Sequence, residues 1–532
     1  MTRNVSYYLR PNIHAEPLWD QWYAWPLLIP PATGARYLTE RHLKIMESYL
    51  AAPQMHAAAV KNPKLLGGPF IDYDGQRVDE IKALYEETKK KRADLLELSA
   101  AIHDLEAMLR SEAGGFCLHP LYQAIPPALR GYVELVYDLN HNPRVRLIEP
   151  LLYRSRFYDR SAQSLMLSPI NGDDRPFILS TPRLEFSDGI HLSLPFDDRS
   201  IDELFRLTFS PRPLSEIHNL IAAPEEKRKL FETFLTTDPP PPYQAYTGDG
   251  IRCRYFGHAC ILVEVNGVSL LFDPVLSYTY ESKVSRYTYL DLPDTIDGVI
   301  ITHNHQDHVL FETLLHIRHK VKNIIVPRCG GGSLQDPSLK LILENCGFAS
   351  VTELAEMESI SLNGVSIMGL PFFGEHADLD IQTKLAYLIR TSRHRLLFAA
   401  DSCNIEPLVY DHIHKEIGDV DALFIGMECD GAPLTWLYGS LFTQPIDRAI
   451  DVSRRLSGSS FEQAVDIVER FNCQNIFVYA MGMEPWLNYI LSLKYTEHSR
   501  PIIESNKLIR HCLERGRAAE RLFGEKEILF GV

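Results

Sequence analysis

The hydrophobic pattern of the second half of the chain predicts a layered α/β domain. After residue 249, short apolar runs alternate with helical stretches such as FEQAVDIVERF. In chain order the runs are RYFGHACILVEV, VSLLFDP, VIITHNHQDH, NIIVP, SIMGLPF, AYLIRT, RLLFAADS, ALFIGMEC and NIFVYAM. Several of them end in polar residues, and a rigid strand aims the side chains at its end into a cleft. We therefore expect the functional groups of this domain at its strand ends.

The first half of the chain has a mixed pattern and no catalytic motif. Residues 79–112 contain good helix formers, no Gly or Pro, and apolar residues at helical spacing, which predicts one long amphipathic helix. Within residues 131–153, two β-rich runs flank the turn signal NHNP and predict a hairpin. Further strands are expected at FILSTPRLEF and IHLSLPF. The expected class of this half is α+β.

A proline-rich segment separates the two halves. Pro239 to Pro242 cannot continue a helix and favour an extended, semi-rigid linker. We place an N-terminal α+β domain at residues 1–238, a linker at 239–248, and a catalytic domain at 249–532.

Charge and cysteine content narrow the class of protein. The net charge of the 532 residues is −15, which argues against a nucleic-acid surface because phosphate binding needs clustered Lys and Arg. The nine cysteines form no CxxC pair, so a thiolate zinc site is not expected, and their odd number fits reduced thiols in the cytoplasm. The chain start has no signal-peptide pattern, and no apolar run reaches the roughly 18 residues of a membrane span.

The strongest chemical signal is the heptapeptide THNHQDH at residues 302–308. Three imidazoles and a carboxylate this close together would repel one another if protonated, and would cost desolvation energy if buried without partners. A pair of metal ions resolves both problems. The HxH spacing sends His303 and His305 to the same side of an extended segment, so both can bind one ion. Asp307 and His308 follow in the loop and can reach a second ion.

This motif after an apolar strand resembles the metallo-β-lactamase superfamily. The resemblance implies an αββα sandwich with metals at the upper edge of two facing sheets, here as the C-terminal part of a chain with a large α+β N-terminal domain. Asp273, in the segment FDP, would lie behind the metal ligands and orient a ligating histidine or a metal-bridging water. Asp401, after RLLFAA, matches the carboxylate that bridges the two ions.

Two positions depart from the hydrolases of that superfamily. The remaining ligand of the first ion lies in FGEHAD, where His376 is the conservative candidate and Glu375 the other. Adjacent residues of an extended segment point in opposite directions, so only one of them should ligate. The late strand NIFVYAMG lacks the usual final histidine, which leaves the second ion with Asp307, His308 and Asp401. Such a site suits an ion harder than zinc and leaves positions open for dioxygen.

These departures resemble the dinuclear-iron β-hydroxylases of nonribosomal peptide pathways, over the whole chain. The resemblance implies an iron held by His303, His305 and Glu375, a second iron held by Asp307 and His308, and Asp401 as the bridge. Glu428 would lie next to the metal ligands without binding an ion itself, and would help to control oxygen access or the response to substrate.

The family also implies the reaction and its partners. The implied reaction is β-hydroxylation of an aromatic amino acid, and the expected substrate is L-p-aminophenylalanine of chloramphenicol-type biosynthesis. The amino acid would be a thioester on a carrier domain of a peptide synthetase. Two iron ions (oxo-bridged when oxidised), O2 as co-substrate and an external electron donor are the expected cofactors. A homodimer formed through the N-terminal domain is a further expectation.

Two other functions compete with this one. A zinc hydrolase of the same fold would act on a thioester, lactone or phosphodiester through a metal-bound hydroxide. Glu375 as a ligand and the absent final histidine count against it. A noncatalytic binding module is disfavoured because the HxHxDH motif and Asp401 are intact.

Overall fold

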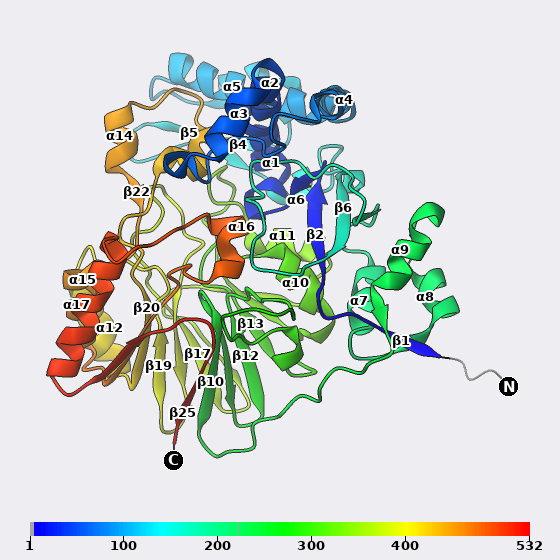
Figure 1. Cartoon of the computed structure of the whole chain (residues 1–532). Coiled ribbons are helices and arrows are strands. Elements are labelled where there is room, and N and C mark those ends of the chain that lie inside the picture. Colours follow the sequence, from blue (N-terminus) through cyan, green and yellow to red (C-terminus); the bar gives the residue numbers. More distant parts are fainter. Residues whose placement is uncertain (1–4, 222, 532) are drawn as a thin grey trace.

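The computed structural model describes residues 5–221 and 223–531, and it contains two sheets that face each other in the second half of the chain (Figure 1). The first sheet has the strand order β15 (Val351–Leu354), β14 (Ile324–Pro327), β13 (Gly298–Ile300), β12 (Val268–Phe272), β11 (Cys260–Val265), β10 (Ile251–Gly257) and β25 (Lys526–Phe530). The second has the order β16 (Ser359–Leu362), β17 (Val365–Leu370), β18 (Ala386–Arg390), β19 (Arg395–Phe398), β20 (Ala422–Gly426), β23 (Asn475–Tyr479) and β24 (Ala518–Arg521).

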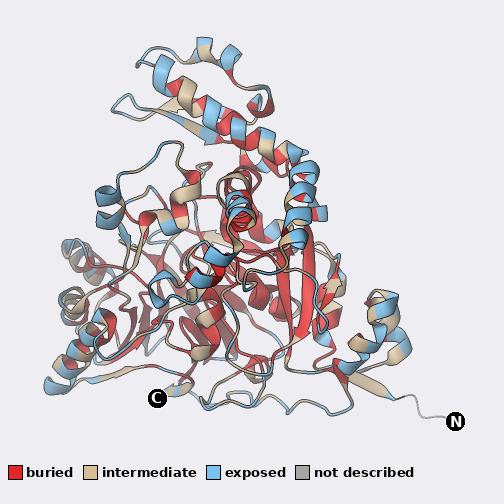
Figure 2. Ribbon diagram, turned by 45° about the horizontal axis from the view of Figure 1, so that its top comes forward, coloured by how far each residue is buried: buried red, intermediate tan, exposed pale blue. Residues whose placement is uncertain are grey.

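Hydrophobic side chains fill the space between the sheets. The rings of Phe272 on β12 and Phe398 on β19 stack across this space with their centroids 4.0 Å apart. Figure 2 shows that buried positions concentrate along the strands, while helices at the margin of the molecule have exposed faces. The near-continuous apolar runs of the sequence therefore correspond to strands that are covered on both faces.

Helices cover the outer faces of both sheets, which gives the expected αββα sandwich. The second sheet is covered by α12 (Leu408–Ile417), α15 (Phe461–Arg470) and α17 (Arg500–Glu514), whose apolar sides share a core with β19, β20 and β23. The first sheet is covered by α10 (Phe311–Ile317) and α11 (Leu339–Asn345). Shorter helices lie in the connections: α13 (Leu434–Tyr438), α14 (Arg448–Ser453) and α16 (Asn488–Leu491). A small ribbon joins β21 (Ala432–Pro433) and β22 (Arg455–Leu456).

The first half of the chain is α+β, as predicted, and lies over the edge of the sandwich where α10 and α16 are found (Figure 1). Its four-stranded sheet has the order β3 (Trp22–Tyr23), β2 (Ile13–Trp19), β6 (Gln163–Pro169) and β7 (Ile190–Leu192). A small sheet joins β8 (Arg212–Pro213), β1 (Ser6–Leu9) and β9 (Leu235–Thr236). The helices are α1 (Pro31–Tyr37), α2 (Leu43–Ala51), α3 (Pro53–Val60), α4 (Val78–Lys91), α5 (Ala93–Glu112), α6 (Glu149–Leu152), α7 (Arg199–Arg206), α8 (Leu214–Leu220) and α9 (Arg228–Thr233).

Several local predictions for this half can be compared with the structure. The hairpin is confirmed as β4 (Val133–Tyr137) paired with β5 (Pro143–Leu147), and a strand forms within IHLSLPF. The single long helix over 79–112 is wrong: Arg92 leaves helical geometry and separates α4 from α5. The strand expected at FILSTPRLEF is also wrong, because that segment is irregular. The proline-rich segment contains no helix or strand between β9 and β10.

Two further features of the described part of the chain concern membrane-spanning helices and disulfide bonds. No helix there is long and apolar enough to cross a membrane. All nine cysteines are free thiols.

Candidate metal centre

The metal motif begins where β13 ends, beside the carboxylate that follows β12. Asp273 is fully buried and accepts hydrogen bonds from the backbone N–H of Thr302 (2.8 Å) and from the Thr302 hydroxyl (2.6 Å). Its Oδ2 also lies 2.8 Å from Nδ1 of His308. Since that contact orients the ring, Nε2 is the nitrogen that His308 can turn toward an ion.

Three groups of side chains have donor atoms close enough to hold an ion, with all atoms of a group within 4.8 Å of one another. They are His303 with His305 and Glu375, His303 with His308 and Asp401, and His258 with Asp307 and His308. Asp401 follows β19 in the second sheet, whereas residues 303–308 follow β13 in the first. The centre therefore lies across the upper seam of the sandwich.

The charges of this cluster fit bound cations. Within residues 5–221 and 223–531, Nε2 of His303 and Oδ1 of Asp401 are buried and have no hydrogen-bond partner. Burial and then the neighbouring imidazoles hold the pKa of His303 well below its ordinary value. Burial, followed by Asp401 and Glu428, raises the pKa of Glu375 well above its ordinary value. Neutral imidazoles and closely spaced buried carboxylates are the donors that a metal pair would satisfy.

The Glu375–His376 segment differs from the expected extended strand. It is a bent loop in which Gly374 has φ 79° and Glu375 has φ 64°. A Cβ on Gly374 would lie only 2.4 Å from Cβ of Cys403, so glycine is needed for this loop to pack against the loop after Asp401.

The bend gives the two adjacent side chains different surroundings. Oε1 of Glu375 lies 3.3 Å from Nδ1 of His305. His376 belongs to none of the three groups, and its Nδ1 lies 3.0 Å from the hydroxyl of Tyr438. The same hydroxyl lies 3.2 Å from Nε2 of His305, so Tyr438 stands between the two imidazoles.

A close backbone contact also positions Asp401. The N–H of Gly426, at the end of β20, donates to the carbonyl of Ala400 (2.7 Å). A Cβ on Gly426 would lie 2.2 Å from Oδ1 of Asp401, so any larger residue would displace this carboxylate.

His258 is the residue that the sequence interpretation missed. It occupies the turn between β10 and β11 with φ 50°, and it is buried. Its Nε2 lies 3.1 Å from Oδ2 of Asp307, and its carbonyl accepts a hydrogen bond from the N–H of Ala480, just beyond β23. The imidazole of His258 thus lies beside the end of β23, the late strand that lacks the final histidine of the hydrolases. The available signal was a histidine directly after a glycine inside the apolar run RYFGHACILVEV, which the hydrophobic pattern predicts as one uninterrupted strand.

A cavity of about 800 Å³ opens onto the cluster. Both halves of the chain line it: Trp25, Arg41 and Phe177 come from the first half, and Asp307, Glu375, Asp401 and Glu428 from the second. Glu428 accepts a hydrogen bond from the N–H of Gly431 (2.6 Å), and burial raises the pKa of its carboxyl to about 7. Burial therefore favours the protonated form of this carboxyl more than it would be favoured at an exposed position.

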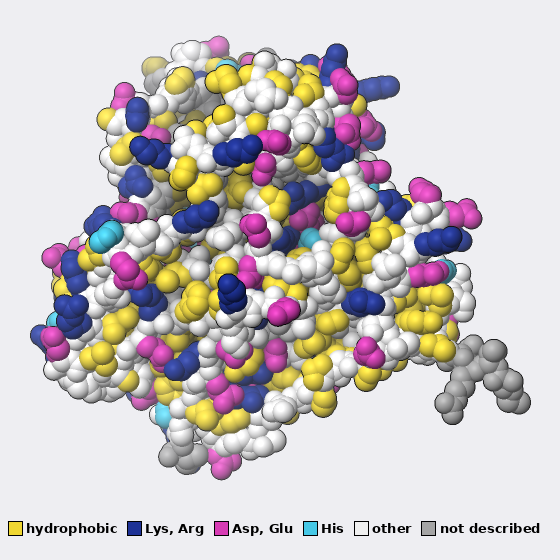
Figure 3. Space-filling model, in the orientation of Figure 1, with side chains coloured by type: hydrophobic (Ala, Val, Ile, Leu, Met, Phe, Trp, Pro, Cys, Tyr) yellow, Lys and Arg dark blue, Asp and Glu magenta, His cyan; other side chains and the backbone are white. Residues whose placement is uncertain are grey.

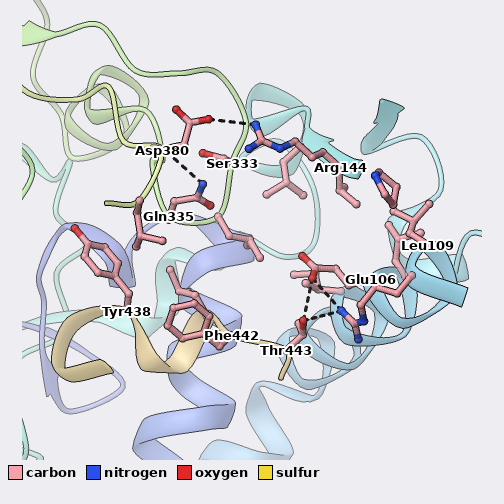
Figure 4. A pocket seen from close by; sticks show the side chains of 18 of the residues that line it. Glu106, Leu109, Arg144, Ser333, Gln335, Asp380, Tyr438, Phe442 and Thr443 are labelled. Carbon is pink, nitrogen blue, oxygen red and sulfur yellow. Dashed lines mark hydrogen bonds and ion pairs between the residues drawn. The ribbon is translucent and has the colours of Figure 1, made fainter. Parts of the chain in front are cut away.

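A second cavity, of about 400 Å³, lies on the other side of Tyr438 and is shown in Figure 4. An ion pair between Arg144 and Asp380 (3.2 Å) lies at one side of it, and Glu106 meets Thr443 at another. Tyr438 thus contributes its ring to this cavity and its hydroxyl to the metal cluster.

Comparisons with known proteins agree with this geometry. Residues 8–239 match a family model described as the diiron non-heme beta-hydroxylase N-terminal domain, and residues 269–468 match the beta-lactamase superfamily domain. The chain is 41% identical, over 97% of its length and 98% of the relative's, to 4-amino-L-phenylalanyl-[CmlP-peptidyl-carrier-protein] 3-hydroxylase of Streptomyces venezuelae. It is 28% identical over 26% of its length to a UPF0173 protein of Pyrococcus abyssi, of which 55% is covered.

The similarity extends to a solved structure. The crystal structure of CmlA, a diiron beta-hydroxylase from Streptomyces venezuelae, superposes with a TM-score of 0.93 at 40% sequence identity, covering 99% of this chain and 100% of the other. The match spans both halves of the molecule, including the N-terminal domain that names the family. The chain therefore belongs to the non-haem di-iron β-hydroxylases, enzymes that carry two iron ions in a metallo-β-lactamase domain preceded by a dedicated N-terminal domain.

Proposed function

We propose that His303, His305 and Glu375 hold one iron, that Asp307 and His308 hold the other, and that Asp401 bridges them. The group of His303, His305 and Glu375 supports the first site, and the group that contains Asp307 and His308 supports the second. The third group, in which Asp401 lies with a histidine of each site, supports the bridge. Asp273 would orient His308, and His258 would orient Asp307 through the 3.1 Å contact. In this arrangement each ion has at least one carboxylate ligand, which offsets its charge.

We also propose the substrate: an aromatic amino acid, L-p-aminophenylalanine in the first instance, held as a thioester on the phosphopantetheine arm of a peptide-synthetase carrier domain. The name of the Streptomyces relative supports both the amino acid and the carrier. A cavity lined by both halves of the chain supports a long, flexible substrate that enters between them.

The irons, when bound, supply the activation of O2 that replaces the β-C–H bond by C–OH. The balance consumes one O2, two electrons from an external donor and two protons, and it releases one water. The role of the protein is to hold the ions, to exclude bulk water and to aim the β-carbon. Glu428 lines the cavity with a pKa near neutrality, so it is placed to exchange a proton or to move when substrate arrives.

The observation that carries this function is the carboxylate of Glu375 beside His303 and His305, where the zinc hydrolases of this fold have a histidine. The experiment compares carrier-loaded amino acid with the free amino acid, using reduced enzyme and oxygenated buffer. We expect hydroxylated product only from the loaded carrier, with faster oxygen consumption in its presence. Hydrolysis of the thioester without hydroxylation would instead identify a hydrolase.

The proposal also covers the cellular compartment, the carrier-docking surface and the oligomeric state. The free cysteines support a reducing, cytoplasmic setting. The large N-terminal domain offers a surface for carrier docking and for a homodimer. Gel filtration with light scattering would determine the number of chains in the particle.

A further inference from the structure

Arg41 is a half-buried cation that lines the metal cavity and has no counter-ion among the residues that the structure describes. It lies in a π-helical turn, Leu38–His42, inserted between α1 and α2. Turns of this kind interrupt regular helical packing and often occur at functional sites. The side chain lines the same cavity as Asp307 and Glu375, although it comes from the other half of the chain.

The carboxylates near Arg41 do not neutralise it. Its neighbour Glu40 is engaged by Arg36 (3.6 Å) and by Lys44. Across the described ranges, no hydrogen bond or ion pair joins the Arg41 guanidinium to any side chain, including the carboxylates that line the cavity. Burial lowers the pKa of Arg41 from its ordinary value. An unpaired guanidinium in this setting is costly unless an anion arrives with the ligand.

The other cations of the cavity differ from Arg41. Arg455 donates to the carbonyls of Asp430 and Gly431, and Arg500 lies 3.6 Å from Asp430. Lys494 is exposed. Figure 3 shows basic and acidic side chains interspersed over the visible face, so no large field of one sign marks an entry path. Recognition of an anion in this cavity therefore depends on individual side chains.

We propose that Arg41 binds the phosphodiester of the phosphopantetheine arm. This inference rests on the proposed function. In an aminoacyl thioester the carboxyl of the amino acid is masked, so the phosphodiester is the anion of the arm. It lies at the opposite end of the arm from the thioester, so a residue that lines the same cavity without belonging to the metal cluster can bind it. A guanidinium can donate two parallel hydrogen bonds to phosphate oxygens.

The test compares two carrier-free substrates, the methyl phosphodiester of aminoacyl-phosphopantetheine and aminoacyl-pantetheine, which differ only in the phosphodiester group. Binding to the iron-loaded enzyme is measured by calorimetry without reductant, so the readout does not depend on turnover. For the unaltered enzyme we expect the phosphate to tighten binding about 10- to 100-fold, the range of a charge-assisted contact. In Arg41→Met that ratio should fall to about one, while binding of aminoacyl-pantetheine stays unchanged.

Matched variants make the result specific. Lys494→Met removes an exposed cation of the same cavity, and Arg144→Met removes a surface cation outside it; both should keep the full phosphate dependence. Arg41→Lys should retain part of it, and this variant serves if Arg41→Met does not fold. Melting temperature and iron content report folding.

Three outcomes would overturn the proposal. One is an unchanged phosphate ratio in Arg41→Met, and another is an equal loss for both substrates. The third is selective loss of binding to the free amino acid, which would assign Arg41 to a carboxylate instead. If the unaltered enzyme binds neither thioester, the proposed function fails before Arg41 is tested.

Discussion

At the scale of single residues, the centre combines side chains that sequence spacing indicates with others that only the fold brings together. Residues 303–308 are contiguous, so their spacing alone predicts a metal site. Asp401 and Glu375 required a resemblance, because nothing local separates a ligating carboxylate from a helix cap or a loop acid. His258 and Tyr438 are 45 or more residues from the motif, and their contacts depend on how the strands register.

The choice between Glu375 and His376 can be tested directly. Glu375→Gln keeps the size of the side chain but removes its charge, so we expect loss of about one iron per chain and a changed optical spectrum. His376→Gln should retain both irons, because this imidazole meets Tyr438 and belongs to none of the donor groups. Iron content and optical spectra of both purified variants show which substitution removes an iron. Loss of iron from His376→Gln but not from Glu375→Gln would restore His376 as the ligand.

The role of His258 has its own test. His258→Asn keeps a residue that tolerates φ 50° but is too short to reach Asp307. We expect affinity for the second iron to fall about 10- to 100-fold, as is usual when the partner of a ligand is removed. His258→Gln, whose amide can still donate a hydrogen bond, should lose less. Metal titration into the iron-free protein measures the difference, and equal affinity in all three proteins would contradict the role.

At the scale of elements, strands are the most predictable part of this molecule. Runs such as RLLFAADS and ALFIGMEC are apolar because both faces of β19 and β20 are covered. The break between α4 and α5 was not predictable from the helical pattern. Arg92 is buried at the break and is held there by Asp20 (2.7 Å) and Asp159, which are distant in sequence. Long-range ion pairs of this kind leave no periodic signal.

The end of β20 provides a test at this scale. Gly426→Ala adds a Cβ that would lie 2.2 Å from Oδ1 of Asp401, so the carboxylate that we propose as the bridge must move. We expect the protein to fold but to hold less iron and to lose most of its hydroxylation. Gly172→Ala is the control, because no atom lies within 4 Å of the added Cβ. Iron per chain and melting temperature of both variants check the expectation; full iron occupancy in Gly426→Ala would refute it.

At the scale of the whole molecule, a buried ion network joins the two halves of the chain. Arg175 contacts Glu16 on β2 (3.0 Å) and Glu312 on α10 (3.0 Å). Tyr23 and Tyr278 also donate to Glu312. Since α10 follows the metal loop directly, the N-terminal domain is fixed to the element that carries residues 303–308.

Removing the central cation should destabilise the protein strongly. Arg175→Met leaves two buried carboxylates without their shared partner, which costs about 3–5 kcal/mol. Burial alone would raise the pKa of Glu16, but Arg183, His14 and Arg175 hold it well below 4.5. The stability from this group is therefore present above pH 4.5 and is lost as the pH falls toward the lower folded value. Denaturant unfolding measured from pH 7 down to pH 3 would show a smaller acid-induced loss in the variant, because its Glu16 has lost one of the cations that lower the folded pKa.

The position of the metal centre across the seam of the sandwich has a consequence for the lifetime of the protein. The proposed ligands that follow β13 and β19 belong to different sheets, so iron held by them would cross-link the sheets. Binding to the folded state alone shifts the folding equilibrium by mass action. When iron is scarce, the sheets should part first at this edge and present cleavable loops to proteases. The amount of enzyme in a cell should then follow the iron supply, before any control of its synthesis.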